Sequence, residues 1–168
     1  MYQYVIIGLI VIVFIICVVF FMPIPADKPH DKELKKYYDE LAVNPNSATA
    51  YMEIARDNIT AYPKPYDTDK ALADISKAIE LDPNLAEAYC LRAILYYDRL
   101  DKIDLALYDL NKALELDPKD ILAYMHRADI YYEQEKYDLA LKDIDSVLEI
   151  DPKDKYAKSM KESINSLK

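Results

Sequence analysis

The stretch "LALYDLNKALELDPKDILAY", residues 105–124, recurs twice in the chain with the same arrangement of apolar positions. The related copies are "KALADISKAIELDPNLAEAY" at 70–89 and "LALKDIDSVLEIDPKDKYAK" at 139–158. Their Asp-Pro pairs end at Pro83, Pro118 and Pro152, so they are 35 and 34 residues apart. A period of this size is typical of a solenoid, in which each unit buries its apolar face only against its neighbours.

Each copy predicts two helices with different apolar faces. Tyr89, Ala93 and Tyr96 are four and seven residues apart, as on one face of a helix, and the next copy repeats this spacing. The second helix carries small residues around a branched one, which lets helix axes approach closely. These positions are Ala71, Ile75 and Ala78, then Ala106, Leu110 and Ala113, then Ala140, Ile144 and Val147. The Asp-Pro pair is expected to end the second helix, because proline disfavours α geometry in the residue before it.

The stretches "AYCLRAILYYDRLDKIDLALYDLNKALELDP" and "AYMHRADIYYEQEKYDLALKDIDSVLEIDP" resemble tetratricopeptide repeats. The resemblance covers about 46–153 and implies a short right-handed α-solenoid of helix hairpins. We expect repeats at 47–84, 85–119 and 120–153. The first departs most, because "NITAYPKPYDTDKA" lengthens the connection between its helices. Segment 26–46 would hold a linker and a leading helix at 31–43, and 154–168 a polar capping helix.

The N-terminal region, 1–25, is predicted to be a transmembrane anchor. Residues 4–22, "YVIIGLIVIVFIICVVFFM", carry no charge and would span ~28 Å as a helix, close to the thickness of a bilayer core. A cleaved signal peptide is the alternative, but "MYQY" lacks basic residues and no small-x-small site follows. The nearest basic residues all follow the span, which places the body in the cytoplasm. They are Lys28, Lys32, Lys35 and Lys36. The expected fold class is therefore all-α, a single transmembrane helix followed by the solenoid.

Charges on the packed faces predict ion pairs between successive repeats. Arg92 and Arg127 follow the leading tyrosines by three residues, and acidic residues recur at matching places in the second helices. Only pairing with the following repeat gives each of the three aspartates a basic partner. Such pairs would fix how successive repeats stack on one another. The expected pairs are Asp74–Arg92, Asp109–Arg127 and Asp143–Lys161. The alternative is that these charges are simply solvated.

Composition argues against several classes of function. The formal net charge of -9 is unsuited to nucleic acid, whose phosphates favour basic faces. The single glycine, Gly8, leaves no phosphate-binding turn for a nucleotide. Cys17 and Cys90 offer no metal-ligand spacing, and neither His30 nor His126 belongs to a catalytic pattern. We therefore expect no catalytic residue, cofactor, metal or small-molecule substrate; an enzyme of unnamed type is the weakest alternative.

The exposed stripe of the first helices is the predicted binding groove. The stripe is apolar and aromatic with acidic residues, so we expect a protein or peptide ligand with apolar anchors and some basic residues. The candidate residues are Met52, Arg56, Glu87, Cys90, Ile94, Tyr97, Leu122, Met125, Asp129 and Tyr132. Family members that hold acidic chaperone tails use a basic groove, and this stripe offers only Arg56, which disfavours that ligand. The alternative is that Ile94, Tyr97, Leu122 and Met125 pack against neighbouring helices.

The combined interpretation is a single-pass membrane protein that displays a non-catalytic scaffold for protein–protein interaction. The bilayer would be contacted through residues 4–22. A second hypothesis is an accessory or assembly subunit of a membrane complex or protein-import machine, in which another subunit fills the groove.

Overall fold

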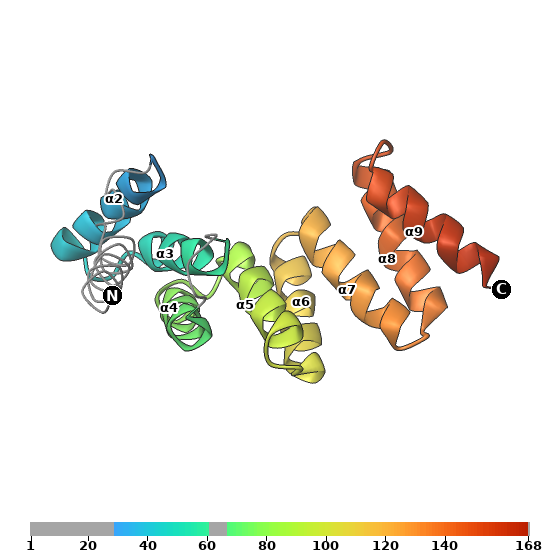
Figure 1. Cartoon of the computed structure of the whole chain (residues 1–168), viewed down its shortest axis with the longest axis horizontal. Coiled ribbons are helices and arrows are strands. Elements are labelled where there is room, and N and C mark those ends of the chain that lie inside the picture. Colours follow the sequence, from blue (N-terminus) through green and yellow to red (C-terminus); the bar gives the residue numbers. More distant parts are fainter. Residues whose placement is uncertain (1–28, 61–66, 168) are drawn as a thin grey trace, which may run out of the picture. The chain divides into compact units, whose positions relative to one another are not determined.

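All the regular secondary structure in the described part of the chain is α-helix. A computed structural model describes residues 29–60 and 67–167, with side chains from Leu34 onward. The chain divides between Lys35 and Lys36 into two units, and the account below concerns the second. The described residues form eight helices, coloured along the sequence in Figure 1. They are α2 (Pro29–Val43), α3 (Ala48–Thr60), α4 (Thr68–Leu81), α5 (Ala86–Asp98), α6 (Ile103–Leu116), α7 (Ile121–Glu133), α8 (Tyr137–Ile150) and α9 (Lys155–Ser166).

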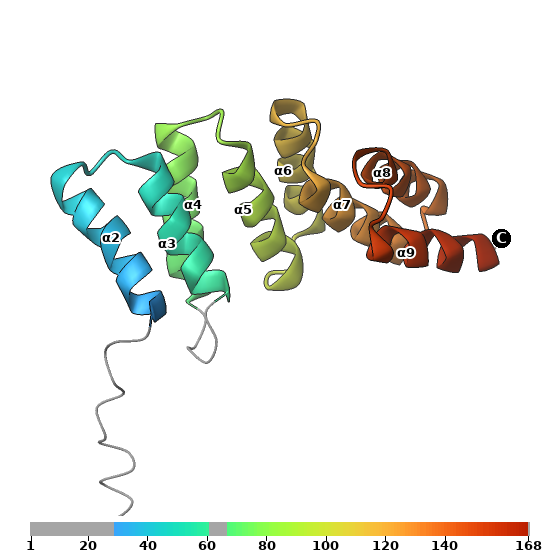
Figure 2. The ribbon, with the colours of Figure 1, turned by 90° about the horizontal axis from the view of Figure 1, so that it is seen from above.

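Consecutive helices form the hairpins that the repeated sequence predicts. Helix α3 packs on α4, α5 on α6, and α7 on α8, and each pair contacts the next along the chain. Figure 2 shows α3, α4, α5 and α6 running alternately in opposite directions. Helix α9 packs on α8, where the polar capping helix was expected, and α2 covers the range expected for the leading helix. The described residues from α3 onward therefore form an array of antiparallel helix hairpins closed by α9.

The small and branched positions of the second helices form the core, as the sequence predicted. Ile75, Leu110 and Ile144 are fully buried, and the flanking alanines are equally inaccessible. The first helices contribute Ala55, Ala93 and Ala128, all with at most 1% of their surface exposed. Because these residues lack long side chains, neighbouring helix axes can approach closely and the larger residues fill the remaining space.

The Asp-Pro motif acts through its carboxylate as well as through its proline. Asp82, Asp117 and Asp151 have extended backbones at the ends of α4, α6 and α8. Each carboxylate accepts a hydrogen bond of 2.9 Å from the backbone N–H two residues later. This Asx turn redirects the chain into the next first helix. At the last two turns a second aspartate, Asp120 or Asp154, then caps that helix.

The turn between α7 and α8 places a non-glycine residue in a left-handed conformation. Glu135 has φ of 57°, and Asp101 has φ of 50° in the equivalent turn between α5 and α6. At the end of α7, the N–H of Lys136 donates to Tyr131 O and that of Glu135 donates to Tyr132 O. This is a Schellman motif, whose left-handed position is usually glycine. The chain has one glycine, Gly8, so Asp101 and Glu135 adopt this conformation although their Cβ atoms make it less favourable.

The ion pairs predicted between successive repeats are wrong in their partners. Arg92 pairs with Asp109 of its own repeat through two hydrogen bonds of 2.7 and 2.8 Å. Arg127 pairs in the same way with Asp143, at 2.8 and 2.6 Å. Both carboxylates are buried, and each guanidinium lies over a tyrosine ring of its own helix. The arginine is anchored within its hairpin because the two helices of a hairpin pack more closely than successive hairpins do.

The remaining predicted pairs also take other forms. Lys161 reaches Asp145 at 2.7 Å rather than Asp143. Asp74 has no arginine, because the position that aligns with Arg92 in its own repeat is the buried Ile54. One carboxylate oxygen of Asp74 is buried without a hydrogen-bond partner among the described residues. These charges are therefore not merely solvated. The arginine–aspartate pair within a hairpin occurs in the second and third repeats and is missing from the described residues of the first.

The membrane anchor stays a prediction. The predicted span, residues 4–22, lies outside the described residues, as does the connection at 61–66 in the first repeat. Among the helices that the structure does describe, none has the length and apolar character needed to cross a bilayer.

Candidate protein-binding face

Polar contacts join the first helices of successive repeats along one face. Arg56 on α3 pairs with Glu87 on α5. The Tyr97 hydroxyl on α5 donates to Glu133 on α7. On α7, Asp129 accepts a hydrogen bond from the Tyr156 hydroxyl on α9. These contacts place α3, α5, α7 and α9 side by side, and we call their shared outer surface the first-helix face.

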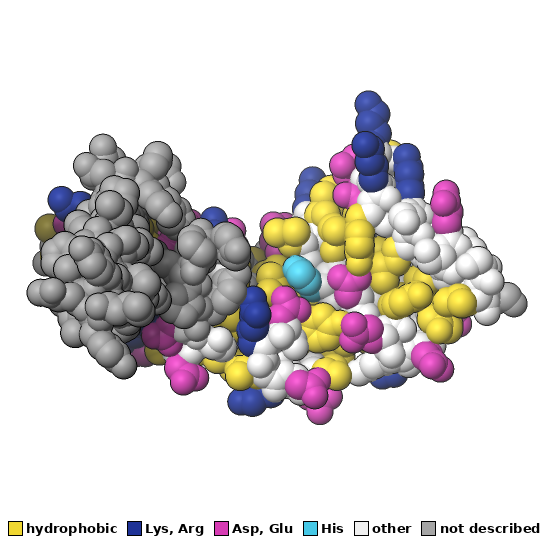
Figure 3. Space-filling model, in the orientation of Figure 1, with side chains coloured by type: hydrophobic (Ala, Val, Ile, Leu, Met, Phe, Trp, Pro, Cys, Tyr) yellow, Lys and Arg dark blue, Asp and Glu magenta, His cyan; other side chains and the backbone are white. Residues whose placement is uncertain are grey.

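The first-helix face mixes apolar and acidic side chains. Figure 3 shows both kinds interspersed over α5 and α7. Leu122 is the most exposed apolar candidate on it, with 57% of its surface accessible, and Glu87 is also exposed. Six further candidates are partly exposed here: Arg56, Ile94, Tyr97, Met125, Asp129 and Tyr132.

Two predicted groove residues are not exposed, and this part of the prediction is wrong. Met52 and Cys90 each have only 3% of their surface accessible and belong to the core. Cys90 lies beneath the face, where burial, together with the nearby charges of Asp120 and Glu87, raises the pKa of its thiol. Each belongs to a core cluster that joins the two helices of its own hairpin to the first helix of the next repeat, so Met52 packs among α3, α4 and α5 and Cys90 among α5, α6 and α7.

The alternative interpretation, in which the apolar candidates pack against neighbouring helices, holds for several of them. Ile94 and Tyr97 pack partly on the core of the second repeat, and Met125 packs on that of the third. Tyr132 also contacts the Tyr137 ring, with centroids 5.7 Å apart. Leu122 does not share this burial. Part of the first-helix face is therefore packed against the core, and a few of its side chains remain exposed to a partner.

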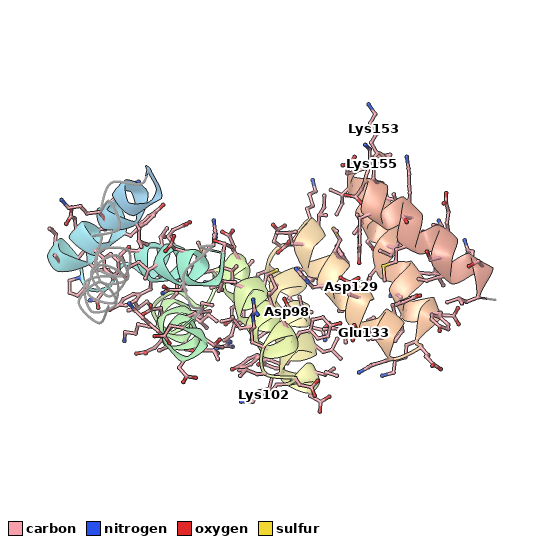
Figure 4. All side chains as sticks on the ribbon, in the orientation of Figure 1. Asp98, Lys102, Asp129, Glu133, Lys153 and Lys155 are labelled. Carbon is pink, nitrogen blue, oxygen red and sulfur yellow. The ribbon has the colours of Figure 1, made fainter. Side chains whose placement is uncertain are left out.

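Acidic groups gather at the C-terminal ends of α5 and α7. Figure 4 shows Asp98 on α5 and Asp129 and Glu133 on α7. Burial raises the pKa of Asp129, and the charges of Glu133 and Asp98 raise it further, against the lowering effects of Tyr156 and His126. These three carboxylates are therefore close enough to act on one another.

The two tyrosines that contact this acidic group are held as neutral donors. Burial and the hydrogen bond to Glu133 raise the pKa of Tyr97 well above its usual value. Burial and the hydrogen bond to Asp129 raise the pKa of Tyr156 to about 12. Each hydroxyl uses one of the roughly four acceptor positions of a carboxylate, so both carboxylates retain capacity for another donor.

The basic candidate on the face is already paired. Arg56 contacts Glu87 and also lies 3.4 Å from Glu53. Lys102, in the turn after α5, lies 5.9 Å from the centre of the Tyr96 ring. Within the part of α5 and α7 that forms the face, negative charge therefore predominates.

A groove of about 380 Å³ lies between the N-terminal halves of α5 and α7. Its walls are mainly apolar, and its polar residues come from the start of α5 and from the turn before α7. The lining residues are Ala86, Glu87, Cys90, Leu91, Ile94, Asp117, Lys119, Asp120, Ile121 and Leu122. Asp120 already caps α7 by accepting from the Ala123 N–H at 3.0 Å. The apolar part of the lining can therefore pack against an apolar side chain.

The geometry offers little support for catalysis or metal binding. Among the described residues there is no cluster of three or more His, Cys, Asp and Glu side chains able to hold a metal. The buried Cys90 thiol has a raised pKa, the opposite of an activated nucleophile.

Tyr156 is the functional candidate that sequence reasoning missed. It aligns with Leu122 and Glu87, which lie 34 and 69 residues earlier in equivalent first helices. Extending the exposed stripe into the capping helix would have identified it. The two hydrogen bonds from tyrosine to carboxylate carry no local sequence signal, because each joins residues of different repeats.

Comparisons with known proteins agree with this architecture. Residues 86–120 and 121–154 each match a family profile described as "Tetratricopeptide repeat". No curated protein sequence matches the chain.

Solved structures of similar fold cover most of the chain. The first tetratricopeptide repeat domain of Spaghetti (RPAP3), bound to the HSP90 peptide SRMEEVD, is 26% identical, with a TM-score of 0.64, over 72% of this chain and 92% of its own. The Arabidopsis OM64 domain is 24% identical, with a TM-score of 0.65, over 73% and 97%. MamA is 18% identical, with a TM-score of 0.68, over 83% and 84%. The last two likenesses concern the fold alone.

Proposed function

We propose that this tetratricopeptide repeat protein is a membrane-anchored, non-catalytic scaffold that binds a segment of a partner protein on its first-helix face. The anchor is residues 4–22, whose uncharged length suits a bilayer span. The body is on the cytoplasmic side, where the lysines that follow the span favour its retention. The observation that carries the binding role is that one face presents the exposed Leu122 near the start of α7 and the carboxylates of Asp129 and Glu133 nearer its end.

The charge of the face supports a partner with basic residues rather than an acidic tail. The peptide bound to the RPAP3 domain, SRMEEVD, ends in acidic residues. The first-helix face instead presents Asp98, Asp129 and Glu133, and its Arg56 is paired with Glu87. Like charges placed opposite one another across an interface cost roughly several kcal/mol of binding free energy, so this face should select against an acidic peptide. A partner segment that carries both an apolar and a basic residue would complement both the exposed Leu122 and the carboxylates.

Site-specific photocrosslinking tests this function. A photoreactive residue at position 132, on the face, is compared with one at position 108, where Tyr108 is 67% exposed on α6 and off the face. We expect a discrete protein adduct in native membranes from position 132 and none from position 108. Equal adducts from both positions would contradict a partner site on this face. A single adduct with another subunit in fixed proportion would instead favour the assembly-subunit hypothesis.

A further inference from the structure

We propose that the first-helix face is a two-part site that reads an apolar and a basic residue of one extended partner segment, about 12 Å apart. The proposal rests on the proposed binding function and specifies its ligand. The apolar part is the groove between α5 and α7, and the basic part is the acidic group formed by Asp98, Asp129 and Glu133.

The groove can hold the apolar anchor. Its volume of about 380 Å³ is that of a small ligand pocket. The buried Cys90, the partly exposed Ile94 and the exposed Leu122 are among the apolar residues that line it. The carboxylate of Asp120, at the same groove, accepts the capping hydrogen bond from the Ala123 N–H. An inserted Leu, Met or Phe side chain would cover Leu122 and remove apolar surface from water.

The acidic group can hold the basic residue. Glu133 and Asp129 are fixed by the hydroxyls of Tyr97 and Tyr156, which come from the helices on either side. Their side chains are thus oriented before a ligand arrives, which lowers the entropy lost on binding. Lys102 lies against the Tyr96 ring. A partner Arg or Lys would meet the carboxylates of Asp129 and Glu133 already oriented to accept its hydrogen bonds.

The two parts lie at opposite ends of the same helices. Groove residue Cys90 precedes Asp98 by eight positions on α5, which is ~12 Å at 1.5 Å per residue. On α7, Leu122 precedes Asp129 by seven positions, or ~10 Å. An extended segment rises about 3.3 Å per residue, so a basic residue three or four positions from the apolar anchor spans this distance. A helical ligand would instead need a separation of about eight positions.

The test uses fluorescein-labelled Gly-Ser peptides that contain one Leu and one Arg separated by one, four or eight positions. Binding to the purified full-length chain is measured by fluorescence anisotropy, with the same detergent in a protein-free blank. We expect the four-position peptide to bind most tightly and its affinity to fall as salt is raised. Tightest binding at eight positions would overturn the extended ligand, and equal binding at all spacings would overturn the two-part site.

Matched variants separate the two parts. Leu122→Ser should weaken the four-position peptide about tenfold, and Glu133→Gln about fivefold while reducing the salt dependence. Leu139→Ser and Glu149→Gln, both exposed on α8 and off the face, should leave binding unchanged. Crosslinking at position 132 that persists while no peptide binds would overturn this proposal and leave the proposed function standing. Loss of both the crosslink at position 132 and peptide binding would overturn this proposal and the proposed function together.

Discussion

Arg127 on α7 donates a hydrogen bond of 2.5 Å to Asn111 on α6, the second helix of the preceding repeat. The same guanidinium is held by Asp143 of its own repeat. Lys161 on α9 and Asp145 on α8 occupy the equivalent positions and form the equivalent contact at 2.7 Å. The contact between repeats therefore exists, but it falls two residues after the aspartate expected to make it. One cation joins its own hairpin to the previous one.

Removing the buried partner of Arg127 should destabilise the fold strongly. Asp143→Ala leaves a partly buried guanidinium without its two-point carboxylate, and we expect a loss of about 3–5 kcal/mol in the free energy of unfolding. Urea unfolding followed by circular dichroism measures this loss.

The exposed contact provides the control for that substitution. Asp145→Ala removes a pair whose members are each about half exposed, so we expect a loss of no more than about 1 kcal/mol. Equal losses from the two substitutions would show that burial does not set the strength of these pairs.

Asp74 should weaken the fold at neutral pH, unlike its aligned counterparts. Burial raises its pKa above the value of 3.8 expected in the unfolded chain, and Lys70 offsets this only in part. A group whose pKa is raised by folding favours the folded state most below pH 3.8, and this contribution is lost as pH rises through the folded pKa. Asp74→Asn should therefore raise stability at pH 7 by about 1 kcal/mol or less.

The pH dependence distinguishes this cause from a general effect of the substitution. The advantage of Asp74→Asn should shrink as pH falls from 7 toward 4, because the native carboxyl then becomes neutral too. Urea midpoints of the two proteins, measured side by side across this range, should converge. A difference that stays constant with pH would contradict a role for the charge.

The left-handed turn after α7 should be improved by glycine. Glu135→Gly removes the Cβ at φ of 57° and a negative charge at a helix C-terminus, so we expect a gain of about 1 kcal/mol. Asp101→Gly should gain less, because aspartate tolerates this conformation better. Thermal unfolding of both variants checks the order, and a destabilised Glu135→Gly protein would contradict the expectation.

The capping helix should contribute to stability through its buried stripe. Ile164 is fully buried against the core of the third repeat, so Ile164→Ala should cost about 2–5 kcal/mol. The neighbouring exposed Asn165 supplies a control, since Asn165→Ala should change little. Similar unfolding midpoints for the two variants would indicate that α9 does not close the array.

The N-terminal segment should decide whether the protein is retained in membranes. We expect the full-length chain to resist carbonate extraction and a chain lacking residues 4–22 to be released. Protease added to sealed vesicles from the non-cytoplasmic side should leave the body intact. Release of the full-length chain would contradict the anchor, whereas digestion of the body would contradict only the orientation.

The sequence by itself determined the repeat, its period and the residues of the core. The positions of Ile75, Leu110 and Ile144 are set by helical periodicity and by the need for small neighbours, both of which are local properties. The same holds for the Asp-Pro turns, because proline and the Asx carboxylate act within a few residues. The capping helix could also be read from its polar pattern and position.

Tertiary structure alone decided which charges meet and which face residues remain exposed. Asp109 and Asp143 are marked in the sequence, but only the distance between the helices of a hairpin assigns them to Arg92 and Arg127 of the same repeat. Helix spacing likewise buried Met52 and Cys90 and left Leu122 exposed. Periodicity gives the direction of a side chain around its own axis. The distance to the next axis, which fixes pairing and burial, depends on all the side chains packed between them.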